Sequence, residues 1–151
     1  MAKPITQKFE NLAIEVETDP VGAPGTFVKV CGMIDATVTR TANIDTAEVP
    51  ADCDDESLPL SVEKQVRSID VSVSGTGVYA AGSDAWLKKW FYSGQPLNVR
   101  ITNEKALSGE AMVETAPALL ANLSNGRQKG QKVSAEFEFQ MDGVPVLTNA
   151  A

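Results

Sequence analysis

The sequence contains no histidine, and its only cysteines are Cys31 and Cys53. Histidine is the usual general base near neutral pH and the commonest metal ligand. Its absence excludes a Ser-His-Asp or Cys-His catalytic site within the chain and any histidine-based zinc site. We expect Cys31, in an apolar strand, to be a buried structural thiol and Cys53 an incidental loop thiol, with a disulfide between them as the alternative.

The sequence also lacks the motifs that carry common chemistries. It has no Gly-rich phosphate loop, no CxxC pair and no recognisable catalytic motif. The acidic run 52–56 suggests calcium, but the central glycine and distant glutamate of an EF-hand loop are missing. We therefore predict no catalytic residue, no metal site and no cofactor, so that an enzyme is not expected.

Long apolar runs are absent as well. No segment approaches the ~20 apolar residues that span a bilayer, and Met1–Glu17 lacks the basic start and apolar run of a signal peptide. We expect no membrane insertion, and a protein that is made and kept in the cytoplasm or leaves the cell by a route other than secretion.

The 151 residues suffice for one domain with a substantial core. Because the net charge is −7, the surface is not suited to binding the phosphate backbone of nucleic acids. We expect a single domain over 1–151, with an N-terminal arm over about 1–8, a long acidic loop over about 42–60 and a C-terminal tail over about 142–151.

Alternation of apolar and polar residues predicts a mainly β, antiparallel fold. In residues 65–79 Ile69, Val71 and Val73 face one way and polar residues the other. In residues 131–140 Phe137 and Phe139 face inward. Further strands are predicted over 9–17, 26–41 (broken at a glycine), 97–102 and 145–147, while 106–127 is ambiguous and contains the turn signal Asn125-Gly126.

One helix is predicted over 83–94, with Ser83 as N-cap and Gly94 followed by a proline as its end. Trp86, Leu87, Trp90 and Phe91 form one stripe, which we expect to cover the core of the sheet. The alternative is a platform of Trp86, Trp90 and Tyr92 that stacks on a carbohydrate.

The loop over about 42–60 contains six acidic residues and no basic one. It is longer than a compact domain usually carries without a purpose. Either it is a flexible insertion, or it orders against a neighbouring subunit. The acidic residues are Asp45, Glu48, Asp52, Asp54, Asp55 and Glu56.

Three segments, in this order, resemble the major tail tube proteins of long-tailed bacteriophages and gene transfer agents. Val-Cys-Gly-Met-Ile at 30–34 leads through Thr-Arg-Thr-Ala at 39–42 to Asp-Cys-Asp-Asp-Glu at 52–56. The strand 68–77 precedes Trp-Leu-Lys-Lys-Trp at 86–90, and Gln-Pro-Leu-Asn-Val-Arg-Ile follows at 95–101. The resemblance covers roughly residues 27–140 and rests on pattern and order.

The resemblance implies a β-sandwich of two antiparallel sheets with a flanking helix. Family members form stacked rings, generally hexameric, whose joined sheets line a lumen through which DNA leaves. It also implies a virion tail protein, assembled in the host cytoplasm, with tail-tip, tape-measure and tail-terminator proteins as further partners and no specific binding of the passing DNA.

Within that family the polar strand faces would line the lumen. These candidate residues are Asp70, Ser72, Ser74, Glu136, Glu138 and Gln140. The acidic loop would contact a neighbouring subunit, with candidate basic partners at Arg40, Lys64, Arg67, Arg127, Lys129 and Lys132. A carbohydrate- or receptor-binding β-sandwich, a tail-completion protein and a secretion-system tube protein are the alternatives.

Overall fold

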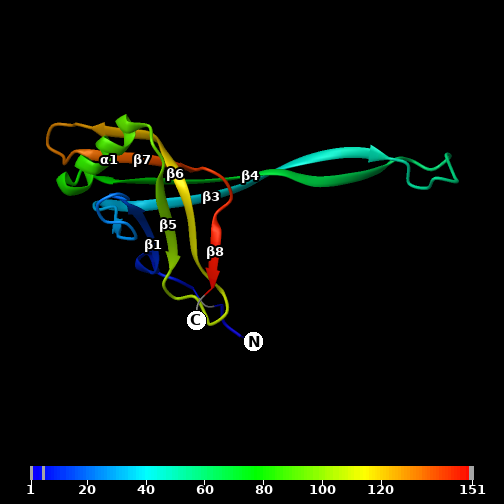
Figure 1. The fold of residues 1–151 in the computed structure, drawn as a ribbon, viewed down its shortest axis with the longest axis horizontal. Coiled ribbons are helices and arrows are strands. Elements are labelled where there is room, and N and C mark those ends of the chain that lie inside the picture. The colour runs from blue at the N-terminus through cyan, green and yellow to red at the C-terminus, as the bar shows by residue number, and fades with distance from the viewer. Residues whose placement is uncertain (1, 5, 150–151) are drawn as a thin grey trace.

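Eight strands and one α-helix make up the described part of the chain in the computed structural model, which describes residues 2–4 and 6–149 (Figure 1). A short 3-10 helix, Phe9–Asn11, precedes them. The elements are β1 (Leu12–Glu17), β2 (Phe27–Lys29), β3 (Met33–Val49), β4 (Ser61–Val78), α1 (Ala81–Ser93), β5 (Leu97–Asn103), β6 (Ala111–Gly126), β7 (Ser134–Met141) and β8 (Val146–Asn149).

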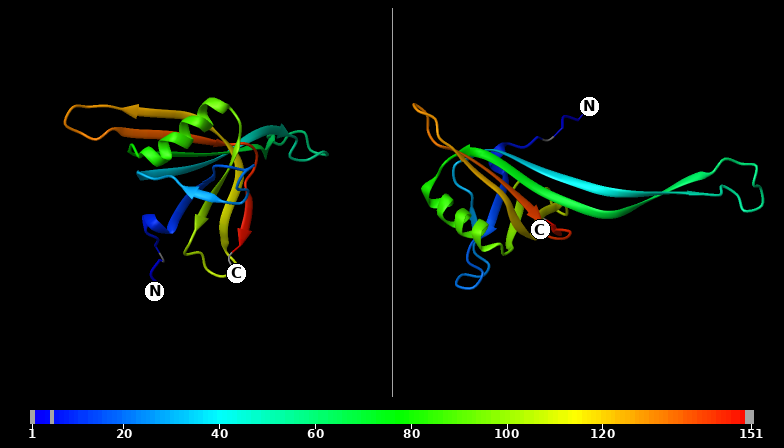
Figure 2. Two further views of the ribbon diagram at one scale, coloured as in Figure 1. Left: turned by 60° about the vertical axis from the view of Figure 1, so that its left-hand side comes forward. Right: turned by 90° about the horizontal axis from the view of Figure 1, so that it is seen from above.

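All strand pairs are antiparallel, in the order β2-β1-β5-β6-β7-β4-β3, with β8 also paired to β6. The long strand β6 belongs to both halves of the sheet. Its first half pairs with β5 and β8, and its second half, from Ala118 on, pairs with β7, with a bulge between Leu120 and Asn122. The predicted mainly β, antiparallel fold with one helix is confirmed, and the two layers are halves of one continuous, strongly bent sheet (Figures 1 and 2).

The core lies between α1 and the sheet face that α1 covers. Leu87 and Trp90 of the helix are 5% and 3% exposed and pack with Val73, Phe137 and Phe139. A 13-residue helix is marginal in isolation, so this packing is what holds it. The predicted role of the helix as the cover of the core is therefore correct.

Two details of the predicted helix are wrong. The helix begins at Ala81, its N-cap is Ala80 without a side-chain cap, and Ser83 lies inside its first turn. The hydroxyl oxygen of Ser83 instead accepts a hydrogen bond from the Cys31 amide, at 2.8 Å. The predicted end is correct, because Gly94 adopts the left-handed conformation with φ 66°.

The break expected in the early strand lies at Gly32, which separates β2 from β3 and has φ +82°. The backbones of Gly32 and Gly77 approach so closely here that a methyl group on Gly77 would collide with the Gly32 carbonyl oxygen. Glycine at both positions lets β3 start alongside the end of β4.

Other predicted boundaries shift. The first strand begins at Leu12, because Phe9–Asn11 is a 3-10 helix. The ambiguous segment is the long strand β6, and Asn125-Gly126 ends that strand, with the turn after it. Cys31 is exposed in the turn before β3, so the prediction that it is buried is wrong.

Candidate functional site

Strands β3 and β4 continue past the body of the protein as a two-stranded arm (Figure 1). The pairing of β4 with β7 starts only at Ser72, so residues 41–70 form a ribbon to which no third strand of the described residues is added. Every residue from Ser61 to Asp70 is exposed. An isolated two-stranded ribbon is marginal in water.

One face of the arm carries most of its apolar side chains, interrupted by Glu48 and Lys64. Partners in an antiparallel ladder share a face, and Ala42 pairs with Ile69 while Ile44 pairs with Val66. A register shift between Asn43 and Ile44 places an extra residue in β4, which moves its apolar positions from odd to even numbers. The bulge thus keeps Ile44, Val66 and the next apolar position, Val62, on the face that continues the core.

The other face of the arm is polar and internally bonded. The Asn43 amide donates hydrogen bonds to Ser68 Oγ at 2.8 Å and to Asp70 Oδ2 at 2.9 Å. Arg67 forms an ion pair with Asp45 across the ribbon, with 3.6 Å between the charged atoms. These contacts fix the pairing but add little stability, because both partners of the ion pair are exposed.

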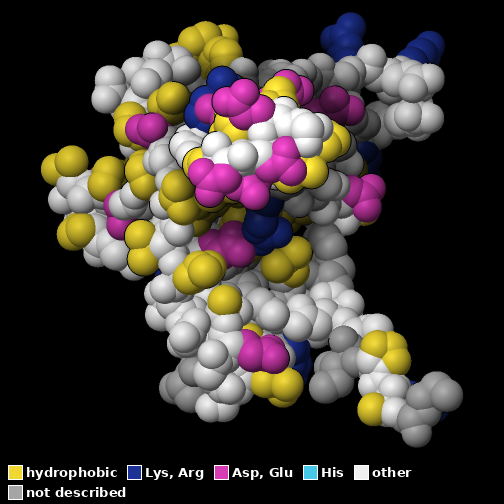
Figure 3. All heavy atoms as spheres, turned by 90° about the vertical axis from the view of Figure 1, so that its right-hand side faces the viewer, with side chains coloured by type: hydrophobic (Ala, Val, Ile, Leu, Met, Phe, Trp, Pro, Cys, Tyr) yellow, Lys and Arg dark blue, Asp and Glu magenta, His cyan; other side chains and the backbone are white. Residues whose placement is uncertain are grey.

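The tip of the arm, residues 50–60, is the true extent of the acidic loop. The predicted bounds 42–60 are wrong, because 42–49 is strand and Asp45 and Glu48 lie on β3. Four of the predicted acidic residues remain in the tip, Asp52, Asp54, Asp55 and Glu56. Figure 3 looks along the arm, and acidic side chains gather at the end nearest the viewer.

Carboxylates within the tip accept hydrogen bonds from neighbouring residues of the tip. Asp52 Oδ1 accepts a hydrogen bond from the Asp54 amide at 2.9 Å, and Asp55 Oδ1 accepts from both the amide and the hydroxyl of Ser57. The hydrogen bonds from Ser57 lower the pKa of Asp55 below its ordinary value. The apolar residues Leu58 and Leu60 follow and are 46% and 57% exposed.

A groove lies at the root of the arm, where the arm meets β8. We call it the elbow groove; its volume is about 160 Å³. Arg40 and Glu114 both line it and form a two-point ion pair, with Nη2 to Oε1 at 2.8 Å and Nε to Oε2 at 3.3 Å. The remaining lining residues are apolar: Ile69, Val71, Val144, Pro145 and Leu147.

The six predicted lumen residues lie together on one polar face of the sheet. Ser72 pairs with Gln140 and Ser74 with Glu138. Asp70 lies two positions before Ser72, and Glu136 two before Glu138, so they share this face. Val73 and Phe139, between these positions, are fully buried on the helix side.

Sequence reasoning missed further members of this polar face on β3. Asp35, Thr37, Thr39 and Thr41 pair with Thr76, Ser74, Ser72 and Asp70, respectively. The alternation of polar and apolar residues along β3 could be read from the sequence. The residue at which β3 starts and its pairing register with β4 could not. The carboxylates of this face up to the root of the arm are Asp35, Asp70, Glu136 and Glu138. Asp45 and Glu63 continue the face along the arm.

The half-sheet β3-β4-β7-β6 has two open edges. Within the described residues, β3 pairs only with β4. The pairing of β5 with β6 stops at Ala118, so residues 119–126 of β6 have β7 on one side and, in the described part of the chain, no strand on the other. Such edges expose unpaired amides and carbonyls that a further strand can satisfy.

The tryptophans do not form a binding platform. Trp90 is 3% exposed, its indole nitrogen donates to the Gln95 carbonyl oxygen at 2.9 Å, and its ring centre lies 4.9 Å from that of Phe139. Trp86 is partly buried against the core. Phe91, predicted to be core, is instead 39% exposed and packs edge-on against Tyr92.

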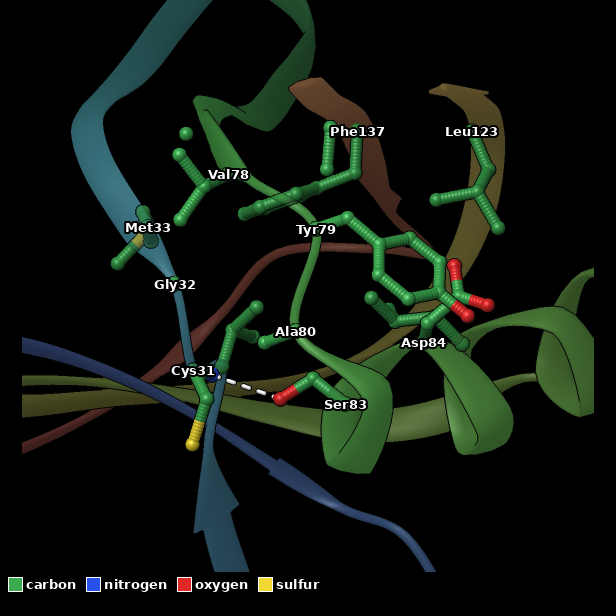
Figure 4. Close-up of a pocket in the computed structure, with 14 residues that line it drawn as sticks. Cys31, Gly32, Met33, Val78, Tyr79, Ala80, Ser83, Asp84, Leu123 and Phe137 are labelled. Carbon is green, nitrogen blue, oxygen red and sulfur yellow. Dashed lines mark hydrogen bonds between the residues drawn. The ribbon is translucent and has the colours of Figure 1, made fainter. Parts of the chain in front are cut away.

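Asp84 of α1 accepts hydrogen bonds from residues outside the helix, including Asn125 of β6. It is buried, and its carboxylate forms an ion pair with Lys88 at 2.7 Å. Burial raises the pKa of Asp84, but hydrogen bonds from Lys88, Tyr79 and Asn125 and the Lys88 charge outweigh it, so the net pKa lies below its ordinary value. Figure 4 shows Tyr79 beside Asp84, next to a cavity of about 20 Å³, which is large enough for about one water.

Within residues 2–4 and 6–149 no cluster of three or more His, Cys, Asp or Glu side chains is arranged to hold a metal ion. Among the described helices, none has the length and apolar character needed to cross a membrane. Cys31 and Cys53 are both free and exposed, with Cys53 in the arm tip.

The sequence and the fold were compared with known proteins. The model of a family described as phage tail tube protein matches residues 6–147. No curated protein sequence matches the chain significantly.

Among solved structures, the chain is similar to a subunit in the tail of an empty GTA particle with C6 symmetry. The TM-score is 0.71 at 16% identity, over 97% of this chain and 100% of that one. A chain in the virion of a native gene transfer agent particle gives 0.68 at 15% identity, over 95% and 99%. A chain of the SPP1 tail tube gives 0.66 at 10% identity, over 97% and 80%. At these identities the likeness concerns the fold.

Proposed function

The chain belongs to the phage tail tube protein family, and we propose that its copies form rings that stack into a tail tube through which DNA leaves the particle. The open edges of the half-sheet support ring formation. Joining β3 of one copy to residues 119–126 of β6 in the next would satisfy both edges at once. A ring closed in this way leaves neither of these two half-sheet edges open.

The lumen would be lined by the polar sheet face, with Asp70, Glu136 and Glu138 as its predicted charges and Asp35 added by the register. The opposite face is occupied by α1 and the core, so this face is free to meet water. Six copies, the ring size that the family implies, would place about 24 carboxylates around one ring. Such a surface repels phosphates and lets DNA slide without stalling.

The arm would bridge adjacent copies, which deepens the prediction made for the acidic loop. Its apolar face and its lack of a third strand support this role. Arg40 and Arg67, two of the candidate partners for a neighbour's loop, already have ion pairs within their own chain. Lys64, Arg127, Lys129 and Lys132 stay candidates for that contact.

The remaining parts of the proposal follow from the family. The protein would be a structural component of the virion tail, assembled in the host cytoplasm, with no catalytic role. Tail-tip, tape-measure and tail-terminator proteins would be its further partners. The buried Trp90 argues against the carbohydrate-binding alternative.

Negative-stain electron microscopy of the purified protein, concentrated and left to stand, tests the proposal. We expect stacked rings or hollow tubes of uniform width. A chain that stays monomeric at every concentration, including after addition of preformed tail tips, contradicts it. A variant with Glu136→Lys and Glu138→Lys tests the lumen assignment, because its tubes should retain DNA that wild-type tubes release at the same salt concentration.

A further inference from the structure

We propose that the first turn of α1 holds the two open edges of the half-sheet at a fixed position relative to each other, and that Ser83 and Asp84 are thereby positioning residues for ring closure. The inference rests on the proposed function, because these are the edges that would join in a ring. It starts from two contacts, that of Ser83 with the segment before β3 and that of Asp84 with the end of β6.

The two edges meet the helix at the same end of the half-sheet. β3 begins at Met33 and β6 ends at Gly126, and the strands β4 and β7 lie between them. At the spacing of neighbouring strands the two edges are roughly 14 Å apart. Within the described residues each edge has a single neighbouring strand, β4 for β3 and β7 for residues 119–126. The helix starts at this end and covers the inner face of the sheet (Figure 1).

Ser83 contacts the start of the first edge. Its hydroxyl oxygen accepts the hydrogen bond from the Cys31 amide at 2.8 Å, and the residue is 3% exposed. Cys31 is followed by Gly32, in the left-handed conformation, and β3 then begins. On the sheet side the Val78 amide donates to the Gly32 carbonyl oxygen at 2.9 Å. The edge strand therefore enters the sheet between one hydrogen bond to β4 and one to α1.

Asp84 makes the corresponding contact with the second edge. It is 5% exposed and accepts hydrogen bonds from Tyr79 and Asn125, and Lys88 balances its charge at 2.7 Å. Asn125 lies in the open segment 119–126 of β6 and shares the helix side of that strand with the part-buried Leu123. The carboxylate thus connects α1 to the end of the second edge.

The two contacts belong to one turn of helix and point to different segments. Adjacent residues on an α-helix are about 100° apart, so Ser83 reaches toward β3 while Asp84 reaches toward β6. Between them lies the cavity of about 20 Å³, which is lined from both edges, Gly32 and Leu123 among the lining residues (Figure 4). Because it has room for about one water, the helix and both edges pack with little free space.

The polar character of this turn indicates a role beyond covering the core. Serine and aspartate often satisfy the free amides at the start of their own helix, but the N-cap of α1 is Ala80, which has no side-chain hydrogen bond. Ser83 and Asp84 are buried and bond to segments outside the helix instead. Buried polar groups are costly unless their partners are in place, so such pairs favour one relative position of the segments that they join.

Ring closure depends on such a fixed relation. Each copy would contribute one edge to the copy before it and the other edge to the copy after it, so the angle between its edges sets the rotation from copy to copy. An angular error within the copy recurs at every contact and adds up around the ring. Edges that move independently therefore lead to open arcs or to rings of several sizes.

Ser83→Ala tests the contact with the first edge. Because Ser83 is buried, an effect on assembly has to pass through Cys31 and β3. We expect open arcs and rings of mixed size in negative-stain micrographs and native mass spectrometry, and a protein concentration for assembly raised roughly fivefold. The control is Ile101→Val, which removes one buried methyl group from β5. It should lower the urea midpoint of the monomer to a similar degree and still form rings of the wild-type size.

Two results of this comparison overturn the inference. One is a Ser83→Ala protein that forms rings of uniform wild-type size at the wild-type concentration. The other is an Ile101→Val protein whose assembly is impaired as much as that of Ser83→Ala, because the helix would then act only through the overall stability of the fold.

Asn125→Ala tests the contact with the second edge. Asn125 is exposed, so the urea midpoint of the monomer should stay at the wild-type value while ring size varies as in Ser83→Ala. The matched control is Asn122→Ala, an exposed asparagine of the same open segment on its polar face, which should assemble as the wild type does. An equal effect of Asn122→Ala contradicts the assignment.

A double variant separates the contact with Asp84 from a direct contact of Asn125 with the next copy. Asn125→Ala should add nothing to Asp84→Ala, because the carboxylate that it would lose is already gone. A further loss of assembly in the double variant shows that Asn125 acts on the neighbour itself, and it overturns the role of Asp84.

The outcomes also separate this inference from the proposed function. Wild-type rings together with unaffected Ser83→Ala and Asn125→Ala variants overturn the inference alone. A wild-type chain that forms neither rings nor tubes under any condition contradicts the proposed function, and the inference with it.

Discussion

Replacing Trp90 should cost more stability than any other single change in α1. Its side chain is 3% exposed, packs on Phe139 and satisfies the Gln95 carbonyl oxygen. Trp90→Ala removes the ring and leaves a cavity, at about 3–5 kcal/mol. Trp90→Phe keeps most of the packing but loses the hydrogen bond and some volume, at about 2–3 kcal/mol. Domains of this size have a total stability of about 5–15 kcal/mol, so Trp90→Ala approaches the limit of folding.

The assay is urea unfolding of the monomer, followed by far-ultraviolet circular dichroism, with the free energy of unfolding extrapolated to water. Tyr92→Ala is the matched control, because Tyr92 lies on the same helix and is 83% exposed; its effect should stay within about 0.5 kcal/mol. The reasoning is refuted if Trp90→Ala unfolds at the wild-type urea concentration, or if Tyr92→Ala costs as much as Trp90→Ala.

Two further predictions concern the same region of the fold. Because the folded pKa of Asp84 is lowered, its contribution to stability is present above its unfolded pKa and is lost as the pH falls through the folded value. The wild-type free energy of unfolding should therefore decline below about pH 4, and Asp84→Asn should flatten that decline while costing about 1–3 kcal/mol at pH 7. An equally steep decline in Asp84→Asn would contradict the assignment. Gly77→Ala should lower the free energy of unfolding by about 2 kcal/mol or more, since its methyl group meets the backbone of Gly32, and Gly82→Ala, at an open position on α1, is its control. A Gly77→Ala protein with the wild-type melting temperature would exclude the close approach.

Residues at strict alternation were predictable from the sequence. Val71 and Val73 are buried, and Ser72 and Ser74 lie on the other side, because side chains along a strand point to opposite faces. The same rule placed Phe137 and Phe139 in the core and Glu136 and Glu138 opposite them. The end of α1 at Gly94 was predictable because glycine alone adopts the left-handed cap without strain.

The extent of the arm was not predictable. Residues 42–49 read as part of a polar loop, because their pairing partners, 61–69, lie some twenty residues further along the chain. The bulge in β4 hid the apolar face, since it changes the phase of the alternation between Ile69 and Val66. Strict alternation along β4 would therefore place Ile69 and Val66 on opposite faces, although both lie on the face that carries Ile44.

Ser83 and Cys31 show the same limit at single residues. A serine before an apolar stripe is a good N-cap by local rules, yet this hydroxyl bonds to the amide of Cys31, 52 positions away in the chain. Cys31 is exposed because Gly32 turns the chain between two strands. Both outcomes depend on which segments meet in space.

The sequence by itself therefore determined the strand class, the helix that covers the core and the polar face with its carboxylates, since all three follow from local periodicity and composition. Only the tertiary structure decided where β3 and β4 leave the body, which face of the arm is apolar and that a groove forms at its root. Those features arise from pairing register and from contacts between distant segments, which no local pattern encodes.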